Sequence, residues 1–181
     1  MRKGDHIIFT DGRGFMYKGV IRTDDNKEME AEITERLPQP GHSYHLHIAI
    51  SPLKNNDRLE WFIEKAVELG IDEITPIICS HTEKNRVRRE RLEGIILSAM
   101  KQSLKAFLPV LNQPAGFSEF VNEQHNGKKL IAHCNHDSER KAISDVIIKG
   151  EEVLIMIGPE GDFTREEIDL AISKNFVPVH L

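Results

Sequence analysis

The chain has 181 residues, a length that suits one substantial domain with a small second unit. Charged residues at 29% and hydrophobic residues at 39% are ordinary for a globular protein, and neither an apolar run of membrane-spanning length nor a signal-peptide pattern occurs. The two cysteines, Cys79 and Cys134, have no paired spacing, so we expect no disulfide and a reducing, cytoplasmic location.

A net charge of −5 argues against general binding of polyanions, but the charge is unevenly distributed. Between Lys84 and Lys105 there are seven Lys and Arg against two Glu, a local charge of +5 that leaves −10 for the rest of the chain. A basic segment on an acidic body indicates local attraction of an anion. The alternative is a solvated helix face with no ligand.

The amino-terminal part is predicted to be a small antiparallel β unit. Two apolar-rich strands, residues 6–10 and 15–21, flank a glycine-containing hairpin signal at 11–14. Residues 29–37 alternate apolar and charged side chains, the pattern of a half-buried strand. The Pro-Gln-Pro-Gly segment at 38–41 ends this pattern, so we predict two domains, residues 1–41 and 42–181.

Strands and helices alternate through the rest of the chain. Asp57, with Glu60 at the third position, is the predicted N-cap of one helix, and Gly70 is its predicted left-handed C-cap. This alternation is typical of an α/β fold in which helices cover both faces of a parallel sheet. Strands are predicted at 46–50, 74–78, 130–134, 153–157 and 176–181, and the two longest helices at 57–70 and 88–106.

The segment 153–168 is the strongest candidate for a ligand site. It reads as a buried strand, a turn built from glycine and proline, and a helix start at which Thr164 and Glu167 form a capping box. Ligands of α/β folds bind at the carboxyl ends of strands, and we expect Gly161 to need a positive φ or an unobstructed face there. A strand-to-helix turn without a ligand is the alternative, because the spacing matches neither the dinucleotide nor the phosphate-loop pattern.

The residues Gly158-Pro159-Glu160-Gly161-Asp162-Phe163, followed by Glu167-Ile168, resemble the GPEGG-F-S-x-x-E-I signature of RsmE-type methyltransferases. That family is a branch of the knotted SPOUT superfamily and methylates N3 of a uridine in 16S ribosomal RNA. Asp162 stands where the family has its second glycine. Residues 54–70 and 99–109 resemble further family motifs in the same order. The amino-terminal part matches loosely, apart from residues 2–5, which resemble the family's entry segment L-R-x-x-x-G-D.

The resemblance implies a set of site residues. Lys105 replaces a family arginine and lacks the planar fork of a guanidinium. Glu160 is the candidate for taking or orienting the uracil N3 proton, and shaping the loop is its alternative role. S-adenosylmethionine would be bound by Ala132, His133, Ile157, Gly158, Pro159, Glu160, Gly161 and Leu181. RNA would be bound by Lys54, Arg86, Arg88, Arg89, Gln102 and Lys105.

Histidines occur in two groups that raise the question of a metal. No acidic or cysteine ligand accompanies the first group in the sequence, so we interpret its members as surface or edge histidines, and we likewise predict no metal at the second. The first group is His42, His45 and His47, and the second is His133 and His136 around Cys134.

By resemblance, the fold is α/β of the SPOUT type, a parallel sheet with a C-terminal trefoil knot, preceded by a partial PUA-like β-barrel that helps to hold RNA. The implied protein is an S-adenosylmethionine-dependent 16S rRNA (uracil-N3) methyltransferase, a homodimer acting on 16S rRNA or the small ribosomal subunit. By this resemblance, the family's first strand and its closing L-G-x-x-I-L-R-x-E-T-A segment would lie outside the given residues, and we expect a chain that really ended at Leu181 to bind the cofactor poorly. The alternatives are an RNA-binding protein of the same fold without catalysis, and a SPOUT methyltransferase acting on another RNA site.

Overall fold

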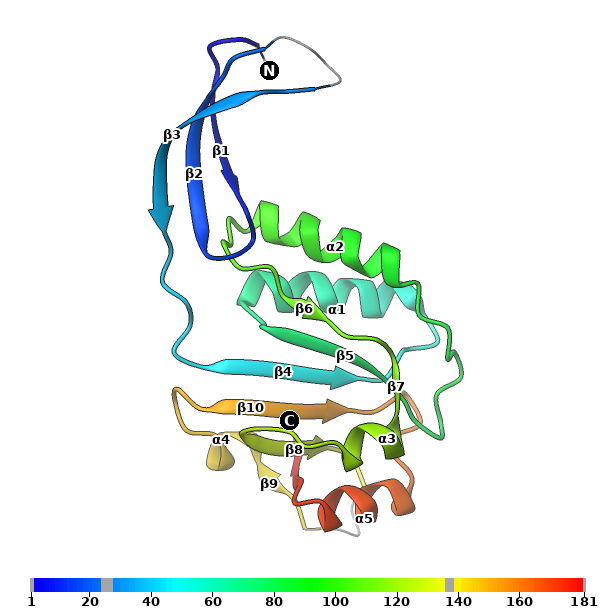
Figure 1. Ribbon diagram of the computed structural model, residues 1–181. Coiled ribbons are helices and arrows are strands. Elements are labelled where there is room, and N and C mark those ends of the chain that lie inside the picture. Colours follow the sequence, from blue (N-terminus) through cyan, green and yellow to red (C-terminus); the bar gives the residue numbers. More distant parts are fainter. Residues whose placement is uncertain (1, 24–27, 136–138, 181) are drawn as a thin grey trace.

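The computed structural model describes residues 2–23, 28–135 and 139–180. A three-stranded antiparallel sheet precedes an α/β domain, and residues 39–44 join the two (Figure 1). The small sheet consists of β1 (His6–Thr10), β2 (Phe15–Ile21) and β3 (Ala31–Pro38). The α/β domain contains β4 (His45–Ile50), α1 (Asn56–Leu69), β5 (Glu73–Ile78), α2 (Arg89–Gln102), β6 (Val110–Leu111), β7 (Ala115–Gly116), α3 (Phe117–Asn122), β8 (Lys128–Ala132), β9 (Lys141–Ala142), α4 (Ile143–Val146), β10 (Glu152–Ile157), α5 (Arg165–Ser173) and β11 (Val177–His180).

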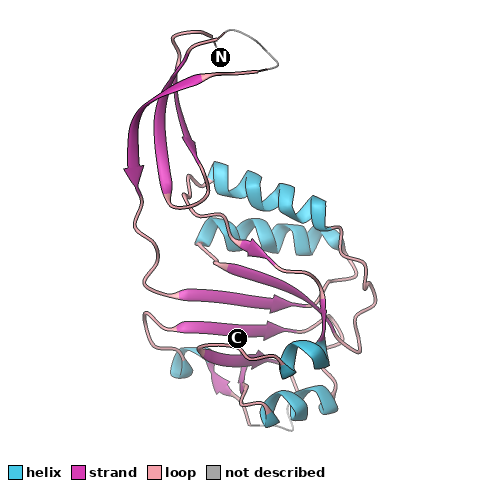
Figure 2. Ribbon diagram, in the orientation of Figure 1, coloured by secondary structure: helices cyan, strands magenta, loops and turns pink. Residues whose placement is uncertain are grey.

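The described strands of the large sheet pair in parallel, in the order β6-β5-β4-β10-β8-β11-β9, with β7 beside β5. The continuous apolar run of β10 suits this central place, because a central parallel strand is buried on both faces. Helices α1 and α2 cover one face, and α3 and α5 cover the other (Figure 2). The predicted α/β class, with a parallel sheet and helices on both faces, is confirmed.

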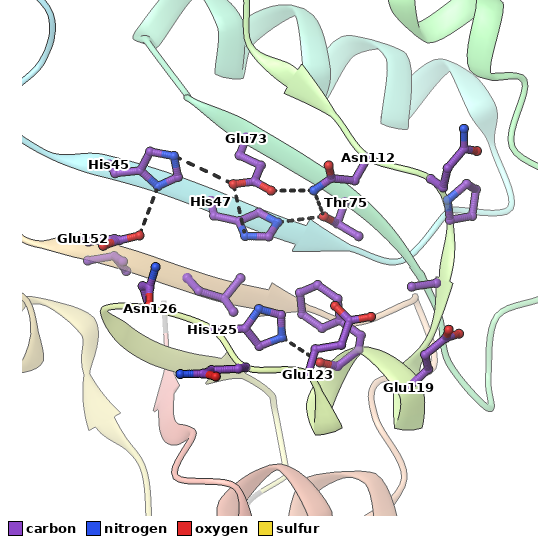
Figure 3. A pocket seen from close by; sticks show the side chains of 17 residues that line it. His45, His47, Glu73, Thr75, Asn112, Glu119, Glu123, His125, Asn126 and Glu152 are labelled. Atoms are coloured by element: carbon purple, nitrogen blue, oxygen red, sulfur yellow. Dashed lines mark hydrogen bonds and ion pairs between the residues drawn. The ribbon is translucent and has the colours of Figure 1, made fainter.

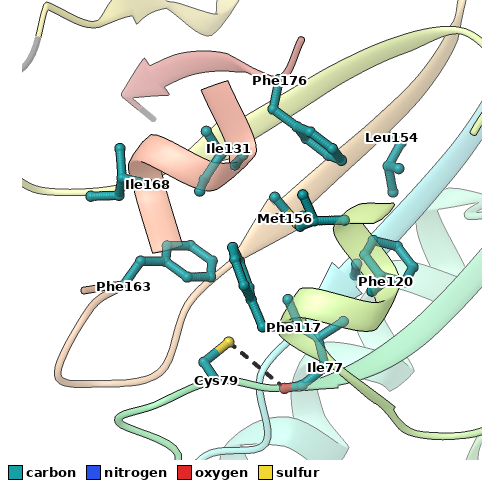
Figure 4. Packing of buried hydrophobic residues seen from close by; sticks show 13 residues of the cluster. Ile77, Cys79, Phe117, Phe120, Ile131, Leu154, Met156, Phe163, Ile168 and Phe176 are labelled. Atoms are coloured by element: carbon teal, nitrogen blue, oxygen red, sulfur yellow. Dashed lines mark hydrogen bonds between the residues drawn. The ribbon is translucent and has the colours of Figure 1, made fainter. Parts of the chain in front are cut away.

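The core beneath α3 and α5 is rich in aromatic side chains. Phe117 and Phe120 of α3 pack with Phe163 and Phe176 over Met156 of β10 (Figure 4). Burying an apolar side chain of this size contributes about 1.5–3 kcal/mol. This packing holds the end of β10 and the start of α5 in place, and therefore also the loop between them.

Helix ends differ from the prediction in two places. Asn55, rather than Asp57, caps α1, because its side chain accepts the Asp57 N–H at 2.9 Å. Helix α2 ends at Gln102 instead of continuing to residue 106, since Leu104 has a left-handed φ of 53° that breaks the helical hydrogen-bond series. The left-handed cap at Gly70, with φ 101°, is confirmed.

The small sheet contacts the α/β domain through its β1–β2 turn. Gly14 N–H donates to the carbonyl of Ala106 at 2.9 Å, and Leu108 N–H donates to the carbonyl of Gly12 at 2.9 Å. Gly14 has a left-handed φ of 95°, and a Cβ there would lie 2.7 Å from the Phe107 ring, so this turn favours glycine.

In the small sheet β2 is central, with β1 and β3 at the edges, so the described residues form an open sheet rather than a closed barrel. The predicted hairpin is confirmed by the antiparallel pairing of β1 with β2. None of the helices within the described ranges has the length and apolar character needed to cross a bilayer.

Candidate functional site

The carboxyl ends of β8 and β10 bring the predicted cofactor residues to one edge of the sheet, called here the carboxyl edge. Strand register places Ala132, the last residue of β8, beside Ile157, the last residue of β10. His133 follows the first of these, and the loop 158–161 follows the second. The predicted cofactor residues therefore share this edge, apart from Leu181, which lies outside the described residues together with His136.

The loop 158–161 uses its glycines for packing within the chain. A Cβ on Gly161 would lie 3.2 Å from the Cβ of His81, and a Cβ on Gly158 would lie 3.1 Å from the Phe163 ring. The positive φ of this turn falls on Asp162, at 60°. A positive φ at Gly161 is therefore not found, and its missing side chain makes room for His81. That Gly161 also leaves an unobstructed face for the cofactor stays a prediction.

Asp162 connects three loops of the carboxyl edge. Its carboxylate accepts the N–H of Cys134 at 2.8 Å and the N–H of Phe163 at 2.9 Å. Its backbone carbonyl accepts a hydrogen bond from Nδ1 of His81 at 2.9 Å. The loops that follow β5, β8 and β10 thus meet at one side chain and its peptide group. Aspartate adopts the left-handed conformation more readily than most residues, so the residue type at position 162 was the feature of the sequence that indicated this turn.

Glu167 ties the start of α5 to the loop after β5. The predicted capping box is confirmed, because Glu167 accepts the Thr164 N–H at 2.9 Å while its own N–H donates to the Thr164 hydroxyl. Its other carboxylate oxygen accepts the N–H of Ser80 at 2.8 Å and the Ser80 hydroxyl at 3.0 Å. Burial raises the pKa of the nearby Cys79 thiol to about 12, with the Glu167 charge as a further cause, so this cysteine is not a nucleophile at neutral pH.

Glu160 is exposed at the tip of the loop and contacts the segment after β4. Its carboxylate accepts the backbone N–H of Lys54 at 3.0 Å. The Lys54 ammonium pairs with Glu83 at 3.0 Å, and this hydrogen bond raises the pKa of Lys54. A cavity of about 430 Å³ lies beside these groups, lined in part by Glu83, Glu160 and Gly161.

His133 is buried at the end of β8. Its backbone N–H donates to the carbonyl of Val179 at 3.4 Å, and its carbonyl accepts from the guanidinium of Arg140 at 2.6 Å. Burial lowers the pKa of the His133 imidazole, so the ring is neutral at pH 7. The edge therefore combines a buried, neutral imidazole with apolar strand ends and a backbone loop.

The predicted RNA-binding residues fall into two groups. Lys54, Arg86 and Arg88 are exposed near the amino-terminal ends of α1 and α2, which lie at the carboxyl edge. Gln102 and Lys105 lie at the far end of α2, whose 14 residues span about 20 Å. The second group borders the small sheet, where Lys105 helps to line a cleft of about 360 Å³ between β1 and α2.

Arg89 has structural partners within the chain. Its guanidinium donates to the carbonyl of Leu111 at 2.7 Å and pairs with Glu93 at 2.8 Å. These contacts anchor the first turn of α2 to the end of β6, and the side chain is only about one-third exposed. A role in RNA binding stays a prediction for Arg89, and its contacts favour a structural role.

His45 and His47 line a cavity at the opposite, amino edge of the sheet. The side chain of His47 is partly buried, at 12% exposure, whereas that of His45 is 43% exposed. Glu73 lies 3.8 Å from both imidazoles, a companion that the sequence spacing did not reveal. Within the described ranges, no group of three or more His, Cys, Asp or Glu side chains is arranged to hold a metal ion.

A parallel α/β sheet with a glycine-containing loop at its carboxyl edge has the form of a ligand-binding α/β enzyme. Comparison with known proteins gives the family. Residues 40–181 match the model of the RNA methyltransferase domain, so the chain belongs to this family.

Individual relatives agree with this assignment. The small subunit ribosomal RNA methyltransferase E of Rickettsia conorii is 26% identical over 176 residues, which cover 96% of this chain and 70% of that protein. A "probable rRNA-methyltransferase" of known structure from Porphyromonas gingivalis is 38% identical, with a TM-score of 0.92 over 99% of this chain and 77% of the other. The small subunit methyltransferase E of Neisseria gonorrhoeae, solved with bound S-adenosylmethionine, is 25% identical, with a TM-score of 0.88 over 100% of this chain and 76% of the other.

Proposed function

We propose that this protein transfers the methyl group of S-adenosylmethionine to N3 of a uridine in the 16S RNA of the small ribosomal subunit, in the cytoplasm. The observation that carries the proposal is the meeting of the loops after β5, β8 and β10 at Asp162, in a chain that matches the RNA methyltransferase family over residues 40–181. Small subunit methyltransferases of this kind are among its relatives.

The residues at the carboxyl edge fit the cofactor that we propose. Ala132 and Ile157 offer apolar contact at the strand ends, and the loop 158–161 offers backbone groups beside them. The carboxylates of Glu160 and Asp162 suit a positively charged sulfonium. When bound, the cofactor supplies an activated methyl group, so the protein has only to orient the two reactants and exclude water.

The chain's own groups have distinct roles in this proposal. Asp162 holds the loops after β8 and β10 at a constant separation, and Glu167 holds the loop after β5 against α5. Methylation at N3 also requires loss of the N3 proton. Glu160 is the candidate acceptor, but its hydrogen bond to the Lys54 N–H favours a role in shaping the loop.

We propose that RNA phosphates contact the exposed cations at the carboxyl edge, chiefly Arg86 and Arg88, and also Lys54, which pairs with Glu83. Gln102 and Lys105 would form a second contact next to the small sheet. The two groups lie at opposite ends of α2, so an RNA strand that touched both would lie along this helix.

We propose a SPOUT-type trefoil knot in the carboxyl-terminal part of residues 42–181 and a partial PUA-like barrel in residues 1–41. In support, β8 lies between β10 and β11 although it precedes both in the chain, so the segments of this part interleave in the sheet. We also propose a homodimer, as the family resemblance implies. Sedimentation velocity at micromolar concentration tests the dimer, and a monomer would contradict it.

Incubation of the purified protein with radiolabelled S-adenosylmethionine and small ribosomal subunits tests the function. We expect label in 16S RNA, and a reverse-transcription stop at one uridine, because a methyl group on N3 blocks base pairing. Label without such a stop would favour a methyltransferase acting on another RNA site. Cofactor titration by calorimetry with no binding would favour an RNA-binding protein without catalysis.

A further inference from the structure

The amino edge of the sheet contains a cavity that the proposed methyl transfer does not use. It lies between the starts of β4, β5 and β10 on the α3 side, and its volume is about 480 Å³, within the range of small-ligand sites (Figure 3). Its lining includes the carboxylates of Glu73, Glu119, Glu123 and Glu152, and none of its described lining residues is lysine or arginine.

A hydrogen-bond network forms the inner wall. The Asn112 amide donates to Glu73 at 2.5 Å and to the Thr75 hydroxyl at 2.8 Å. Thr75 is also 2.7 Å from Nε2 of His47. When the Thr75 hydroxyl accepts from Asn112 and donates its own proton to Nε2, the His47 proton lies on Nδ1, the ring nitrogen that is 3.8 Å from Glu73.

Burial lowers the pKa of His47 to about 4, so at pH 7 this imidazole brings no positive charge to Glu73. His45 lies 3.8 Å from Glu73 and 3.8 Å from Glu152, which is too long for a hydrogen bond. The Glu73 and Glu152 oxygens that face His45 therefore retain capacity to accept hydrogen bonds from a ligand.

Aromatic rings form another part of the wall. The rings of Phe120 and His125 have centroids 4.4 Å apart, and a 2.6 Å hydrogen bond from Nε2 of His125 to the Phe120 carbonyl fixes the imidazole. Carboxylates beside ring faces suit an alkylammonium ion, because the carboxylates accept hydrogen bonds from its ammonium group and its methylene carbons pack on the rings. Four carboxylates exclude an anion, and the absence of a metal-binding arrangement among the described residues favours an organic cation over a metal ion.

We propose that this cavity binds a small organic cation with a primary ammonium group, which donates hydrogen bonds to Glu73 and Glu152 while its carbon chain lies against Phe120 and His125. The proposal does not depend on methyl transfer, because the cavity and the loop 158–161 lie at opposite edges of the sheet.

Calorimetric titration of the whole chain with putrescine tests the proposal, and butanediol, its neutral analogue, is the matched ligand control. We expect one putrescine per chain and no binding of the diol. Glu73→Gln keeps the shape and an acceptor for Asn112 but removes the charge, so putrescine affinity should fall by roughly tenfold or more. Glu35→Gln makes the same change of charge on the small sheet and should leave affinity unchanged.

Equal affinities in the wild type, Glu73→Gln and Glu35→Gln would overturn the proposal, since they would indicate diffuse attraction to an acidic protein. Absence of binding at millimolar putrescine would also overturn it. Glu152→Gln provides a second variant if Glu73→Gln does not fold, because its side chain is 45% exposed. The expected result is again a loss of affinity.

Discussion

The two edges of the large parallel sheet differ in how they use polar groups. At the carboxyl edge, the side chains of Asp162 and Glu167 bond to backbone N–H groups and hold loops together. At the amino edge, His47, Thr75 and Glu73 bond or face one another around a cavity. The first arrangement gives a rigid backbone surface, and the second leaves charged oxygens available to a ligand.

Parallel strands place their outgoing loops at one edge, and the loops after β5, β8 and β10 meet there through Asp162 and Glu167. The backbone groups of these loops are satisfied by the two carboxylates. At the amino edge, side chains on the same face of neighbouring strands contact one another, as His47 of β4 and Thr75 of β5 do. We therefore expect mutations to disturb loop geometry at the carboxyl edge and protonation or charge at the amino edge.

The largest expected effect concerns protonation at the amino edge. The pKa of His47 is lowered from 6.5 to about 4 in the folded protein, mainly by burial. The neutral His47 imidazole therefore contributes stability above pH 6.5, and this contribution is lost as the pH falls toward 4, because only the unfolded chain takes up the proton in that interval. The free energy of unfolding should fall by up to about 3 kcal/mol. Urea unfolding at pH 7 and pH 4 measures it.

His47→Gln should show a smaller loss of stability between these two pH values. His45→Gln, which removes a more exposed imidazole, should behave as the wild type does. An equal acid-induced loss in His47→Gln and in the wild type would show that His47 does not titrate in this way.

Gly161→Val tests the carboxyl edge. The added side chain would start 3.2 Å from His81 and must displace this residue or the loop. A displacement of about 1 Å at a reacting centre costs roughly 100-fold, and we expect cofactor affinity and methyl transfer to fall by about that factor. Calorimetry and a methyl-transfer assay measure the loss, and circular dichroism should show an intact fold. Normal cofactor binding would place the pocket elsewhere.

Replacing both Arg86 and Arg88 by Glu should weaken RNA binding on the order of tenfold and flatten its salt dependence, with cofactor affinity unchanged. Lys149 and Lys174 allow the same change of net charge away from the carboxyl edge, so replacing both by Glu is the matched control. Filter binding over a series of salt concentrations compares the two. If both pairs weaken binding equally, RNA responds to net charge alone.

The smallest expected effect is that of Glu160→Gln. Glutamine keeps the oxygen that accepts the Lys54 N–H, so turnover should change by less than about threefold if Glu160 only shapes the loop. If Glu160 takes the N3 proton, turnover should instead fall by roughly two to four orders of magnitude with cofactor affinity intact. Single-turnover methyl transfer at saturating cofactor distinguishes the two roles.

The sequence predicted the α/β class, the hairpin and the capping box, because each depends on residues close together in the chain. It did not predict β6, β7, β9 and α4, whose two to four residues are too short to show periodicity. The bonds from Asp162 to Cys134 and His81 could not be predicted either, since they join segments 28 and 81 residues apart. For the same reason, the sequence did not show that Glu73 and Thr75 lie beside His47.

The buried carboxylate of Glu167 has a consequence for how the protein opens. Because it bonds to Ser80 and Thr164 at once, the first turn of α5 cannot unwind without releasing the segment after β5. These two segments should therefore open as one cooperative unit, and their amide hydrogens should exchange with solvent at a common free energy. A substitution at either end of this connection should then increase the rate of amide hydrogen exchange at the other end.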